Sequence, residues 1–409
     1  MNPWIASSWL YDAFVAIGYK IFDLRFVLAL AVLSRLALAI TVFVLGGGLR
    51  GRFWTAVLLS AAAQCVLGST QPLPVYGSML AYATVLGALF AYRRSGNLRL
   101  LYPLPVVFLL WANFHEQFVF GVIVLLLFVI TCIVERKNVP SIRSVISIAV
   151  LSLLATICTP YGWKPYSVFF ADVTSLASPY FADHLALHFR SPQDYLLLLL
   201  TMSAFLVLGL RRSRDIFQIA LMVGCSIAAF HAQRDVWLVA LAAVAVIAVE
   251  PIATNVQMEP DSQALIPATL AIVLILVAVA VNSHGSHASA LNEISYTYPV
   301  RAADYIRDHH LPQPIFNTLV SGGFLAWYLP EYPVAIDGRT DLYGAEYNIA
   351  YGKVMNAEEH YSTFAPLNRA GTLVIEKKSL MAAALASVPE FKTVYSDHVA
   401  LVLVRESMQ

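Results

Sequence analysis

Long apolar runs separated by short polar turns dominate the first two thirds of the chain. A helix that crosses a bilayer needs about 20 mostly apolar residues. We therefore predict ten membrane-spanning helices, at residues 26–45, 53–69, 73–92, 100–114, 117–134, 143–159, 195–210, 216–231, 236–250 and 265–282. Several of these segments are short, which a bundle accommodates by local mismatch or by burying helices in protein.

The segment 1–25 has a different pattern, because its aromatic and aliphatic residues are interrupted by Ser7, Ser8, Asp12 and Lys20. This pattern predicts a helix that lies in the membrane interface, outside the cytoplasm. Such a helix at the start of a chain needs an earlier helix to carry it across. We therefore expect either that 1–25 itself spans the membrane or that a preceding helix is missing from the sequence.

The composition changes sharply after residue 282, where the membrane region 26–282 ends. The His- and Ser-containing segment 283–298 predicts a linker, and 299–409 predicts a small α/β domain. We expect its helices at 299–309, 322–329, 343–355 and 380–387, and its strands at 314–317, 333–337, 372–376, 392–395 and 399–404. It contains neither a G-x-G-x-x-G nor a G-x-x-x-x-G-K-[ST] pattern, so it has no nucleotide-binding fingerprint.

Composition and charge narrow the class of protein. The chain is 59% hydrophobic and 12% charged, against about 25% charged residues in soluble domains, which excludes a single water-soluble globule. The net charge of +1 gives no basic field for nucleic acid. Cytoplasmic loops of membrane proteins are rich in Lys and Arg, and here basic residues fill alternate loops: Arg50, Arg52, Arg93, Arg94, Arg99, Arg136, Lys137, Arg143, Arg211, Arg212 and Arg214. All ten histidines and the C-terminal domain are then predicted on the opposite, extracytoplasmic side.

Two short segments on that side carry candidate chemistry. The first is Trp111–Gln117, where Asn113, His115 and Glu116 follow a span. Polar groups at the edge of a bundle are costly unless they are paired or functional, so the alternatives are a functional cluster and a helix turn anchored by Trp111. The second is 231–235, where His231 precedes Arg234. A guanidinium at the mouth of a bundle can bind phosphate through two hydrogen bonds, or it can pair internally with a carboxylate.

Further candidates lie in the loop 159–194 and in the C-terminal domain. Tyr161 and His188 are open candidates in the long loop. In 337–344, the residues Asp337, Arg339 and Asp341 could bind a metal or a sugar, or could stabilise a tight loop through hydrogen bonds to the backbone. We favour the second alternative, in which 337–344 forms a tight loop. The histidine pairs elsewhere lack a complete ligand set, so no metal site is predicted.

Three segments together resemble a known superfamily. They are Trp111-Ala112-Asn113-Phe114-His115, Thr159-Pro160-Tyr161-Gly162-Trp163 and Asp337-Gly338-Arg339-Thr340-Asp341-Leu342-Tyr343-Gly344. With them the chain resembles the type C (GT-C) integral-membrane glycosyltransferases, and within these a bacterial branch similar to protein mannosyltransferases.

The resemblance implies a bacterial inner-membrane enzyme that uses a polyprenyl-phosphate-linked sugar outside the cytoplasm, with a glycan or protein as acceptor. It implies an acidic catalytic base in the first external loop, which makes Asp12 a candidate beside Glu116. It also implies that Arg234 contacts the donor phosphate and that His115 lines the cavity. The candidate substrate-binding residues are Asn113, His115, Tyr161, His188, His231, Arg234, Asp337, Arg339 and Asp341. A divalent metal is left open.

The chain also departs from that branch. Glu116-Gln117 follow His115 where the branch has small glycines, and Thr159 replaces an asparagine. The acidic, Trp-rich segment that opens the first external loop of the branch is absent, because this chain starts downstream of it. The departures leave three alternatives: an active enzyme, a truncated or inactive one, and a non-catalytic membrane scaffold for assembly of envelope polysaccharide or glycoprotein. A transporter ranks last, because paired repeats and broken helices are not evident.

Overall fold

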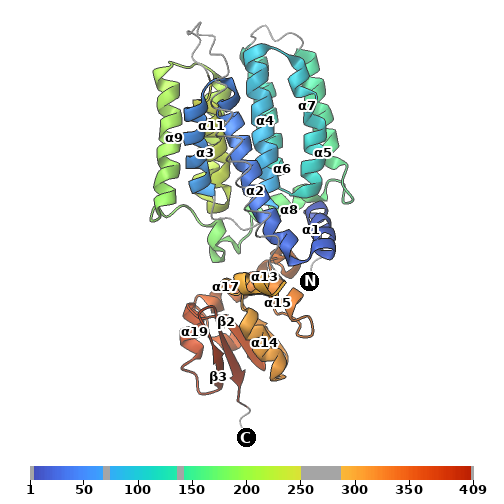
Figure 1. The fold of residues 1–409 in the computed structure, drawn as a ribbon, viewed down its shortest axis with the longest axis vertical. Coiled ribbons are helices and arrows are strands. Elements are labelled where there is room, and N and C mark those ends of the chain that lie inside the picture. The colour runs from blue at the N-terminus through green and yellow to red at the C-terminus, as the bar shows by residue number, and fades with distance from the viewer. Residues whose placement is uncertain (1–3, 68–73, 136–141, 250–286, 407–409) are drawn as a thin grey trace. The chain divides into compact units, whose positions relative to one another are not determined.

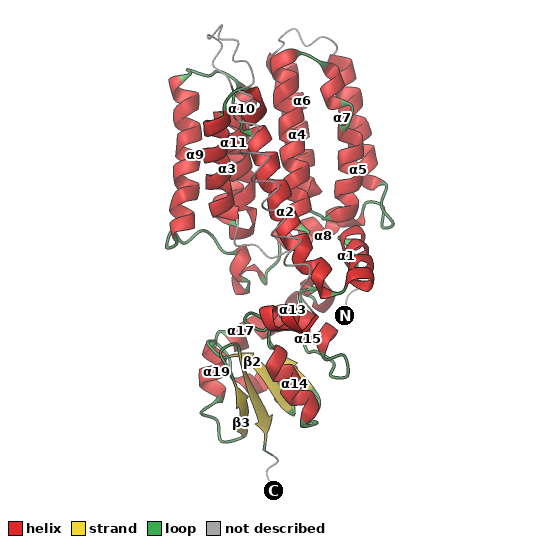
Figure 2. Ribbon diagram, in the orientation of Figure 1, coloured by secondary structure: helices red, strands yellow, loops and turns green. Residues whose placement is uncertain are grey.

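The computed structural model describes residues 4–67, 74–135, 142–249 and 287–406. The chain divides into two compact units. The larger unit comprises Ile5–Ala171 and Ala182–His284, and the smaller comprises Met1–Trp4, Asp172–Phe181 and Gly285–Gln409. Helices make up the larger unit, and the strands drawn in yellow in Figure 2 all belong to the smaller unit.

The apolar runs of the sequence form the helices of the larger unit, as Figure 1 shows. These are α1 (Trp9–Phe22), α2 (Leu24–Leu45), α3 (Phe53–Leu67), α4 (Val75–Ser95), α5 (Leu104–Phe114), α6 (Phe118–Glu135), α7 (Ile142–Ile157), α8 (Lys164–Val173), α9 (Pro192–Leu210), α10 (Ile216–His231) and α11 (Val236–Ile247). Short 3₁₀ turns lie at Gly48–Arg50, Leu98–Leu101, Ser178–Tyr180, Ala182–His184 and Gln233–Asp235.

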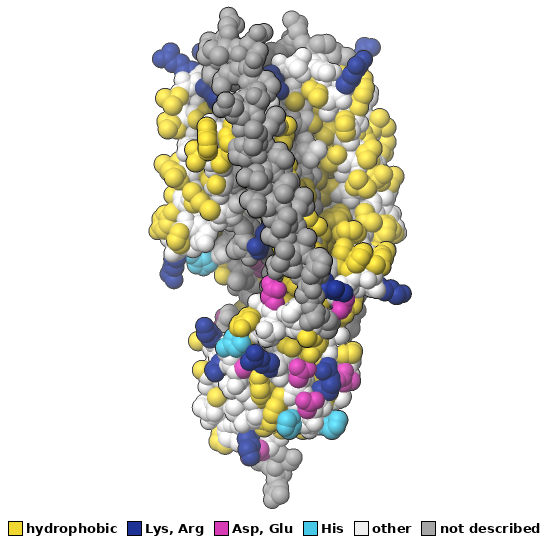
Figure 3. Space-filling view, in the orientation of Figure 1, with side chains coloured by type: hydrophobic (Ala, Val, Ile, Leu, Met, Phe, Trp, Pro, Cys, Tyr) yellow, Lys and Arg dark blue, Asp and Glu magenta, His cyan; other side chains and the backbone are white. Residues whose placement is uncertain are grey.

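The predicted helical character of this region is confirmed. Within the described residues, four helices are long and apolar enough to cross a bilayer: Leu24–Arg50, Val75–Ser95, Phe118–Glu135 and Pro192–Leu210. On the face that Figure 3 shows, apolar side chains cover much of the described surface of the larger unit, and Lys and Arg lie toward its ends. The chain is therefore that of a membrane protein. The number of ten spans stays a prediction, and the predicted span 265–282 lies outside the described residues.

Helix α11 is the centre of the larger unit. Every residue from Trp237 to Val246 is buried, and the helix packs against α3, α4, α9 and α10. A helix that is apolar on all sides is expected to be enclosed by others rather than to sit at a surface. Asp235, just before α11, is buried with it, whereas Gln233 and Arg234 are half-buried.

The helix predicted within 1–25 is present as α1, and Asp23, with a positive φ of 62°, separates it from α2. Its exposed side chains include Phe14, Ile17 and Ile21, so this surface suits lipid, although the interfacial placement itself stays a prediction. The predicted loop 159–194 contains α8 and two 3₁₀ turns.

The smaller unit is a four-stranded sheet with helices on both faces. Its helices are α13 (His287–Ile294), α14 (Val300–Asp308), α15 (Leu319–Tyr328), α16 (Thr340–Tyr343), α17 (Ala345–Met355), α18 (Ala365–Asn368) and α19 (Leu380–Leu385), with a 3₁₀ turn at Tyr361–Thr363. Its strands are β1 (Ile315–Asn317), β2 (Thr372–Glu376), β3 (Phe391–Ser396) and β4 (Ala400–Arg405). The strand order is β1-β2-β4-β3; β1 pairs with β2 in parallel, and the other two pairings are antiparallel, so the predicted terminal hairpin is present.

Alternation along the strands builds two cores. Leu373 and Ile375 of β2 join one apolar cluster with residues of α17, α18 and α19, whereas Val374 joins a second cluster with residues of α14 and α15. Successive strand residues point to opposite faces, so β2 is buried on both sides. The distant segment Asp172–Phe181 also belongs to this unit, and the Tyr180 hydroxyl donates to Glu358 Oε2 at 3.3 Å.

Three predicted features of this unit differ from the structure. Residues 333–337 do not form a strand, because the Asn317 side chain takes the place of a strand ladder: Ala335 N donates to its Oδ1 at 2.8 Å, and its Nδ2 donates to Ile336 O at 2.7 Å. The predicted helix 343–355 is interrupted at Gly344, where φ is 83°. The predicted linker 283–298 contains helix α13.

Candidate functional site

Polar side chains gather where α5 turns into α6. We call Ser78, Asn113, His115, Glu116 and Gln117 the α5–α6 cluster. All five residues lie within the larger unit, and all but Glu116 are buried. Helix α5 ends when His115 adopts an extended backbone, with φ −166°, and its N–H donates to Trp111 O at 2.9 Å. Only three residues separate the two helices, which holds these side chains close together.

A chain of hydrogen bonds crosses the cluster. Trp111 Nε1 donates to Ser78 Oγ at 2.8 Å, and Ser78 Oγ lies 2.9 Å from His115 Nδ1. His115 Nε2 then lies 3.3 Å from Glu116 Oε1. This geometry fits the tautomer in which Nε2 carries the proton and donates to the carboxylate, while Nδ1 accepts from the Ser78 hydroxyl. Ser78 is fully buried, so it orients the imidazole rather than presenting a nucleophile.

Glu116 is held as an ionised carboxylate. Its second oxygen, Oε2, accepts a hydrogen bond of 2.8 Å from Ser7 Oγ. Burial raises the pKa of Glu116, but the neighbouring His115, the Ser7 hydrogen bond and the more distant charge of Arg234 together leave its pKa below the usual value. A carboxylate whose two oxygens both accept and whose pKa is depressed is a weak base, so the structure favours an anchoring role for Glu116.

Asn113 ties the cluster to two other segments. Trp9 Nε1 of α1 donates to Asn113 Oδ1 at 2.9 Å. The Asn113 amide in turn donates to Cys158 O, just beyond α7, at 3.0 Å. Its amide therefore satisfies an otherwise open helix-end carbonyl and fixes the N-terminal segment beside α5. These contacts supply a structural reason for Asn113 that does not require a ligand.

The second predicted segment meets the same cluster through Gln117. Gln117 Nε2 donates to Asp235 Oδ1 at 3.3 Å, and Asp235 Oδ1 lies 3.9 Å from Arg234 Nε. Arg234 Nη1 lies 3.0 Å from His184 Nε2. The internal Arg234–Asp235 pair, one of the two alternatives for 231–235, is thus present at long range. It leaves the guanidinium close enough to Glu116 to depress the pKa of that carboxyl.

Gln117 Oε1 and Trp237 Nε1 are buried polar atoms of this region with no hydrogen-bond partner among the described residues. Gln117 is 7% exposed and Trp237 is 0% exposed, and an unsatisfied buried polar group costs about 1–3 kcal/mol. One acceptor and one donor are therefore left for water or for a polar ligand near the start of α11.

The remaining predicted residues of the larger unit lie at varied positions. Asp12 is exposed on α1; partial desolvation raises its pKa, and its carboxylate has no hydrogen-bond partner among the described residues. Its neighbour Tyr11 packs edge-on against Phe114, with ring centroids 5.3 Å apart, which brings α1 to the end of α5. His188 Nδ1 lies 2.9 Å from Gln233 Nε2. Tyr161 and His231 make no described side-chain contact with the cluster.

Asp337, Arg339 and Asp341, the predicted site residues of the smaller unit, lie at the end of the segment 333–337 or just after it. Asp337 is 3% exposed and binds Arg339, with Arg339 Nη2 2.5 Å from Asp337 Oδ2 and Arg339 N 2.9 Å from Oδ1. These bonds, with that from Tyr343, lower the pKa of Asp337 against the effect of its burial. Asp341 is exposed in the first turn of α16. The pair Asp337–Arg339 thus closes a tight loop, as the structural interpretation of this segment predicts.

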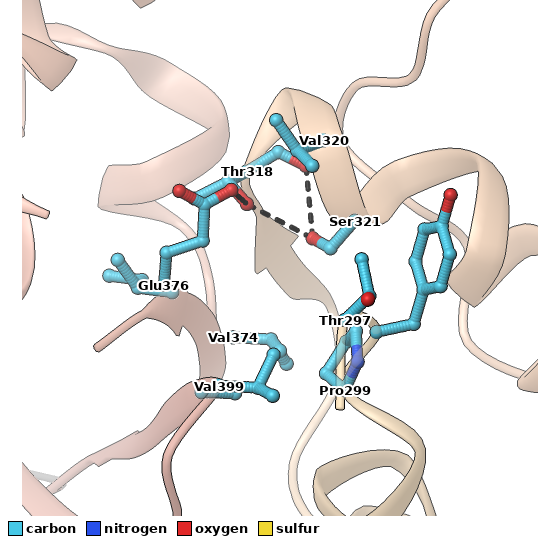
Figure 4. Close-up of a pocket in the computed structure, with 11 residues that line it drawn as sticks. Thr297, Pro299, Thr318, Val320, Ser321, Val374, Glu376 and Val399 are labelled. Carbon is cyan, nitrogen blue, oxygen red and sulfur yellow. Dashed lines mark hydrogen bonds between the residues drawn. The ribbon is translucent and has the colours of Figure 1, made fainter. Parts of the chain in front are cut away.

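A small polar notch lies where the parallel strands β1 and β2 end, and Figure 4 shows its lining. Thr318 Oγ1 lies 3.1 Å from Ser321 Oγ and 3.4 Å from Glu376 Oε1. Its volume of about 20 Å³ has room for a water molecule and not for a substrate. In the part of the chain that the structure describes, no three His, Cys, Asp or Glu side chains form a group that could hold a metal ion.

Comparison with known proteins returns no relative: no family model matches the chain, and no curated protein matches its sequence. The fold and cluster define a helical membrane protein with a small α/β unit and a buried polar cluster at one helix turn. Several members of the network were not predicted as site residues: Ser7, Trp9, Ser78, Gln117, His184 and Asp235. Ser78 had one sequence signal, since it is a polar residue inside the apolar run 73–92.

Proposed function

We propose that the protein is a GT-C-type membrane glycosyltransferase that transfers a sugar from a polyprenyl-phosphate donor to a glycan or protein acceptor outside the cytoplasm. In this proposal α2–α7, α9–α11 and the predicted span 265–282 form ten spans in the bacterial inner membrane. The Arg-rich loops face the cytoplasm, by the rule that governs basic loops. The α5–α6 cluster and the C-terminal unit then face the opposite side.

One observation carries the proposal: Arg234 lies close enough to Glu116 to lower its pKa, and Gln117, next to Glu116 in the chain, binds Asp235 beside Arg234. Arg234 would bind the donor phosphate, where its guanidinium stabilises the negative charge that grows as the leaving group departs. Asp235 and His184 would hold the guanidinium in place. The unpartnered Gln117 Oε1 would accept a donor hydroxyl.

Transfer requires a base for the acceptor hydroxyl. The hydroxyl proton passes to the base, the acceptor oxygen bonds to the anomeric carbon, and the bond from that carbon to the phosphate oxygen breaks. Asp12 suits this role better than Glu116, because its carboxylate accepts no described hydrogen bond and its pKa is raised. Glu116 and His115 then act as positioning residues. A divalent metal would supply further charge stabilisation, and the described residues offer no dedicated ligand set for one.

The Arg234→Ala variant tests the proposal in purified protein, with a lipid-linked-sugar transfer assay. We expect transfer to fall by a factor of about 100 or more, the cost of removing a donor to developing charge. Arg190→Ala is the matched control, since Arg190 is exposed on a nearby loop, and it should transfer normally. Full transfer by Arg234→Ala would contradict the proposal.

The alternative function is a non-catalytic scaffold for envelope polysaccharide or glycoprotein assembly. One observation favours it: both carboxylate oxygens of Glu116 already accept hydrogen bonds from protein groups, so neither is open to a substrate. The same assay separates the two functions. If the protein is a scaffold, the unmodified chain will transfer no sugar from any polyprenyl-phosphate donor. If it is an enzyme, the unmodified chain will transfer sugar and Asp12→Asn will abolish that transfer.

A further inference from the structure

The smaller unit contains an open groove between the end of α15 and the helices α16 and α17. Its volume is about 560 Å³, within the range of 300–1,000 Å³ that is typical of small-molecule sites. The residues that matter for its chemistry are Tyr332, Pro333, Arg339, Leu342, Tyr343 and Tyr347. We call it the Tyr343 groove. It is distinct from the polar notch at the ends of β1 and β2.

One wall of the groove is a rigid pair of aromatic rings. Tyr343 and Tyr347 stack with centroids 5.1 Å apart and an interplanar angle of 22°. The Tyr347 hydroxyl donates to Ala335 O at 2.6 Å, and Phe364 packs edge-on against Tyr347 at 5.0 Å. Because these contacts fix the rings before a ligand arrives, binding against them loses little conformational entropy.

The polar element of the groove is Arg339, which is fixed on two sides. Its Nε and Nη2 bind the carboxylate of Asp337, and the Trp4 ring lies over the guanidinium, with 5.5 Å between the guanidinium carbon and the ring centroid. The Arg339 side chain is still 47% exposed. The Tyr343 side chain also hydrogen-bonds the Asp337–Arg339 pair. Since Nε and Nη2 face Asp337, Nη1 is the nitrogen that can donate to a ligand oxygen.

The charge of the groove selects a neutral ligand. Asp337 compensates the charge of Arg339, and residues 284–409 together carry 13 acidic and 9 basic residues. A phosphate or carboxylate would therefore gain little electrostatic attraction here. A neutral molecule with an apolar face for the tyrosines and hydroxyl groups for Nη1 meets both requirements, and the C–H face and hydroxyl rim of a pyranose ring have this shape.

We propose that the Tyr343 groove binds a neutral pyranose saccharide, which stacks on Tyr343 and accepts a hydrogen bond from Arg339 Nη1. This inference deepens the proposed function, on which it rests, by assigning the acceptor of the transfer to the saccharide class and giving it a binding site on the smaller unit.

The test is saturation-transfer NMR on the full chain in detergent, with the methyl glycosides of glucose, mannose and N-acetylglucosamine and their disaccharides as probes. Inorganic phosphate and a proline-rich peptide are competitors. We expect at least one saccharide to bind, Tyr343→Ala to raise its Kd about 3- to 10-fold, and Tyr343→Phe to retain binding because the ring is kept. Tyr296→Ala, at an exposed tyrosine outside the groove, is the matched control and should bind normally.

The outcomes separate this inference from the proposed function. The saccharide-site proposal is overturned if no saccharide binds, or if Tyr343→Ala leaves saccharide binding unchanged. It is also overturned if the proline-rich peptide displaces the saccharide at Tyr343. In these cases Arg234-dependent transfer still supports the enzyme. Tyr343-dependent binding by a chain that transfers no sugar supports the groove and contradicts the proposed enzyme.

Discussion

His115 Nε2 and Glu116 Oε1 lie 3.3 Å apart, although the two residues are adjacent in the chain. Neighbouring side chains in a regular helix point about 100° apart, so this pairing depends on the extended backbone with which His115 ends α5. The pair is the centre of the network that runs from Trp111 through Ser78 to Ser7. It ties three separate segments to one helix turn.

The first prediction concerns pH. The pKa of Glu116 is lower in the folded protein than its usual value of 4.5, so its ionised form stabilises the fold above about pH 4.5, and this contribution is lost as the pH falls through the folded pKa. Glu116→Gln should be less stable than the unmodified chain by about 2 kcal/mol at pH 7. Thermal unfolding of both proteins in detergent, from pH 7 to pH 3, measures the difference.

The stability difference between Glu116→Gln and the unmodified chain should shrink steadily below pH 4.5. A difference that grew on acidification would show that Glu116 is not held ionised. Asp183→Asn is the control, because Asp183 is exposed in the same unit and makes no described side-chain contact. That variant should unfold within about 0.5 kcal/mol of the unmodified chain.

The second prediction concerns an ion triad at the other end of α4. Arg93 Nη2 lies 2.8 Å from both Glu135 Oε2 and Asp215 Oδ2, and the three side chains are 8–18% exposed. Arg93→Gln would leave two carboxylates close together without a cation, and we expect a loss of about 3 kcal/mol in unfolding free energy. Arg94→Gln, at the exposed neighbouring position, should change stability by less than about 0.5 kcal/mol.

Neutralising the carboxylates as well should restore stability in the triple variant Arg93→Gln/Glu135→Gln/Asp215→Asn, since no unpaired charge then remains. The side-chain oxygen of Asn still accepts from Gln218 N, which Asp215 caps at the start of α10. Detergent-phase thermal unfolding of the three variants checks both statements. Equal loss in the single and triple variants would exclude charge repulsion as the cause.

The third prediction compares two adjacent glycines of α15. A Cβ on Gly322 would clash with two backbone atoms that cannot move aside, Ile336 O and Asp337 Cα. A Cβ on Gly323 would meet no atom within 4 Å. Gly322→Ala should therefore destabilise the smaller unit by about 3 kcal/mol or displace the loop that carries Arg339. Gly323→Ala should be neutral or stabilising by up to about 1 kcal/mol, because alanine favours helix. Urea unfolding monitored by tryptophan fluorescence tests the pair, and equal behaviour of the two variants would contradict it.

The fourth prediction concerns Asn317, which is fully buried and bonds the backbone of Ala335 and Ile336. Asn317→Ala leaves buried backbone groups without partners, at a cost of about 1–3 kcal/mol. Amide hydrogen exchange in peptides covering 333–339 should accelerate by about 5- to 150-fold, read by mass spectrometry. Asn356→Ala, whose amide meets only exposed Glu358 at 3.3 Å, should leave those amides unchanged. Unaltered protection in Asn317→Ala would refute the bridging role.

The pattern of apolar and polar residues predicted some helices and strands correctly and one strand wrongly. The runs that form α6 and α9 have an apolar composition that only a membrane or a protein core accepts, so their helical state follows from composition. Strands β2 and β4 follow from short apolar runs between turns. Residues 333–337 have the same apolar character, yet Asn317, distant in sequence, satisfies their backbone groups and no strand forms.

The sequence by itself determined that the chain is a helical membrane protein with a small α/β unit, because hydrophobicity and its period depend on residue type alone. It also placed Asn113, His115, Glu116 and Arg234 among the candidates, because polar groups at the ends of apolar runs stand out. Tertiary structure alone decided their partners: Ser7 saturates Glu116, Gln117 reaches Asp235, and Tyr343 stacks on Tyr347. A hydrogen bond or a stacked ring pair depends on distances of a few ångströms between segments, which spacing along the chain does not encode.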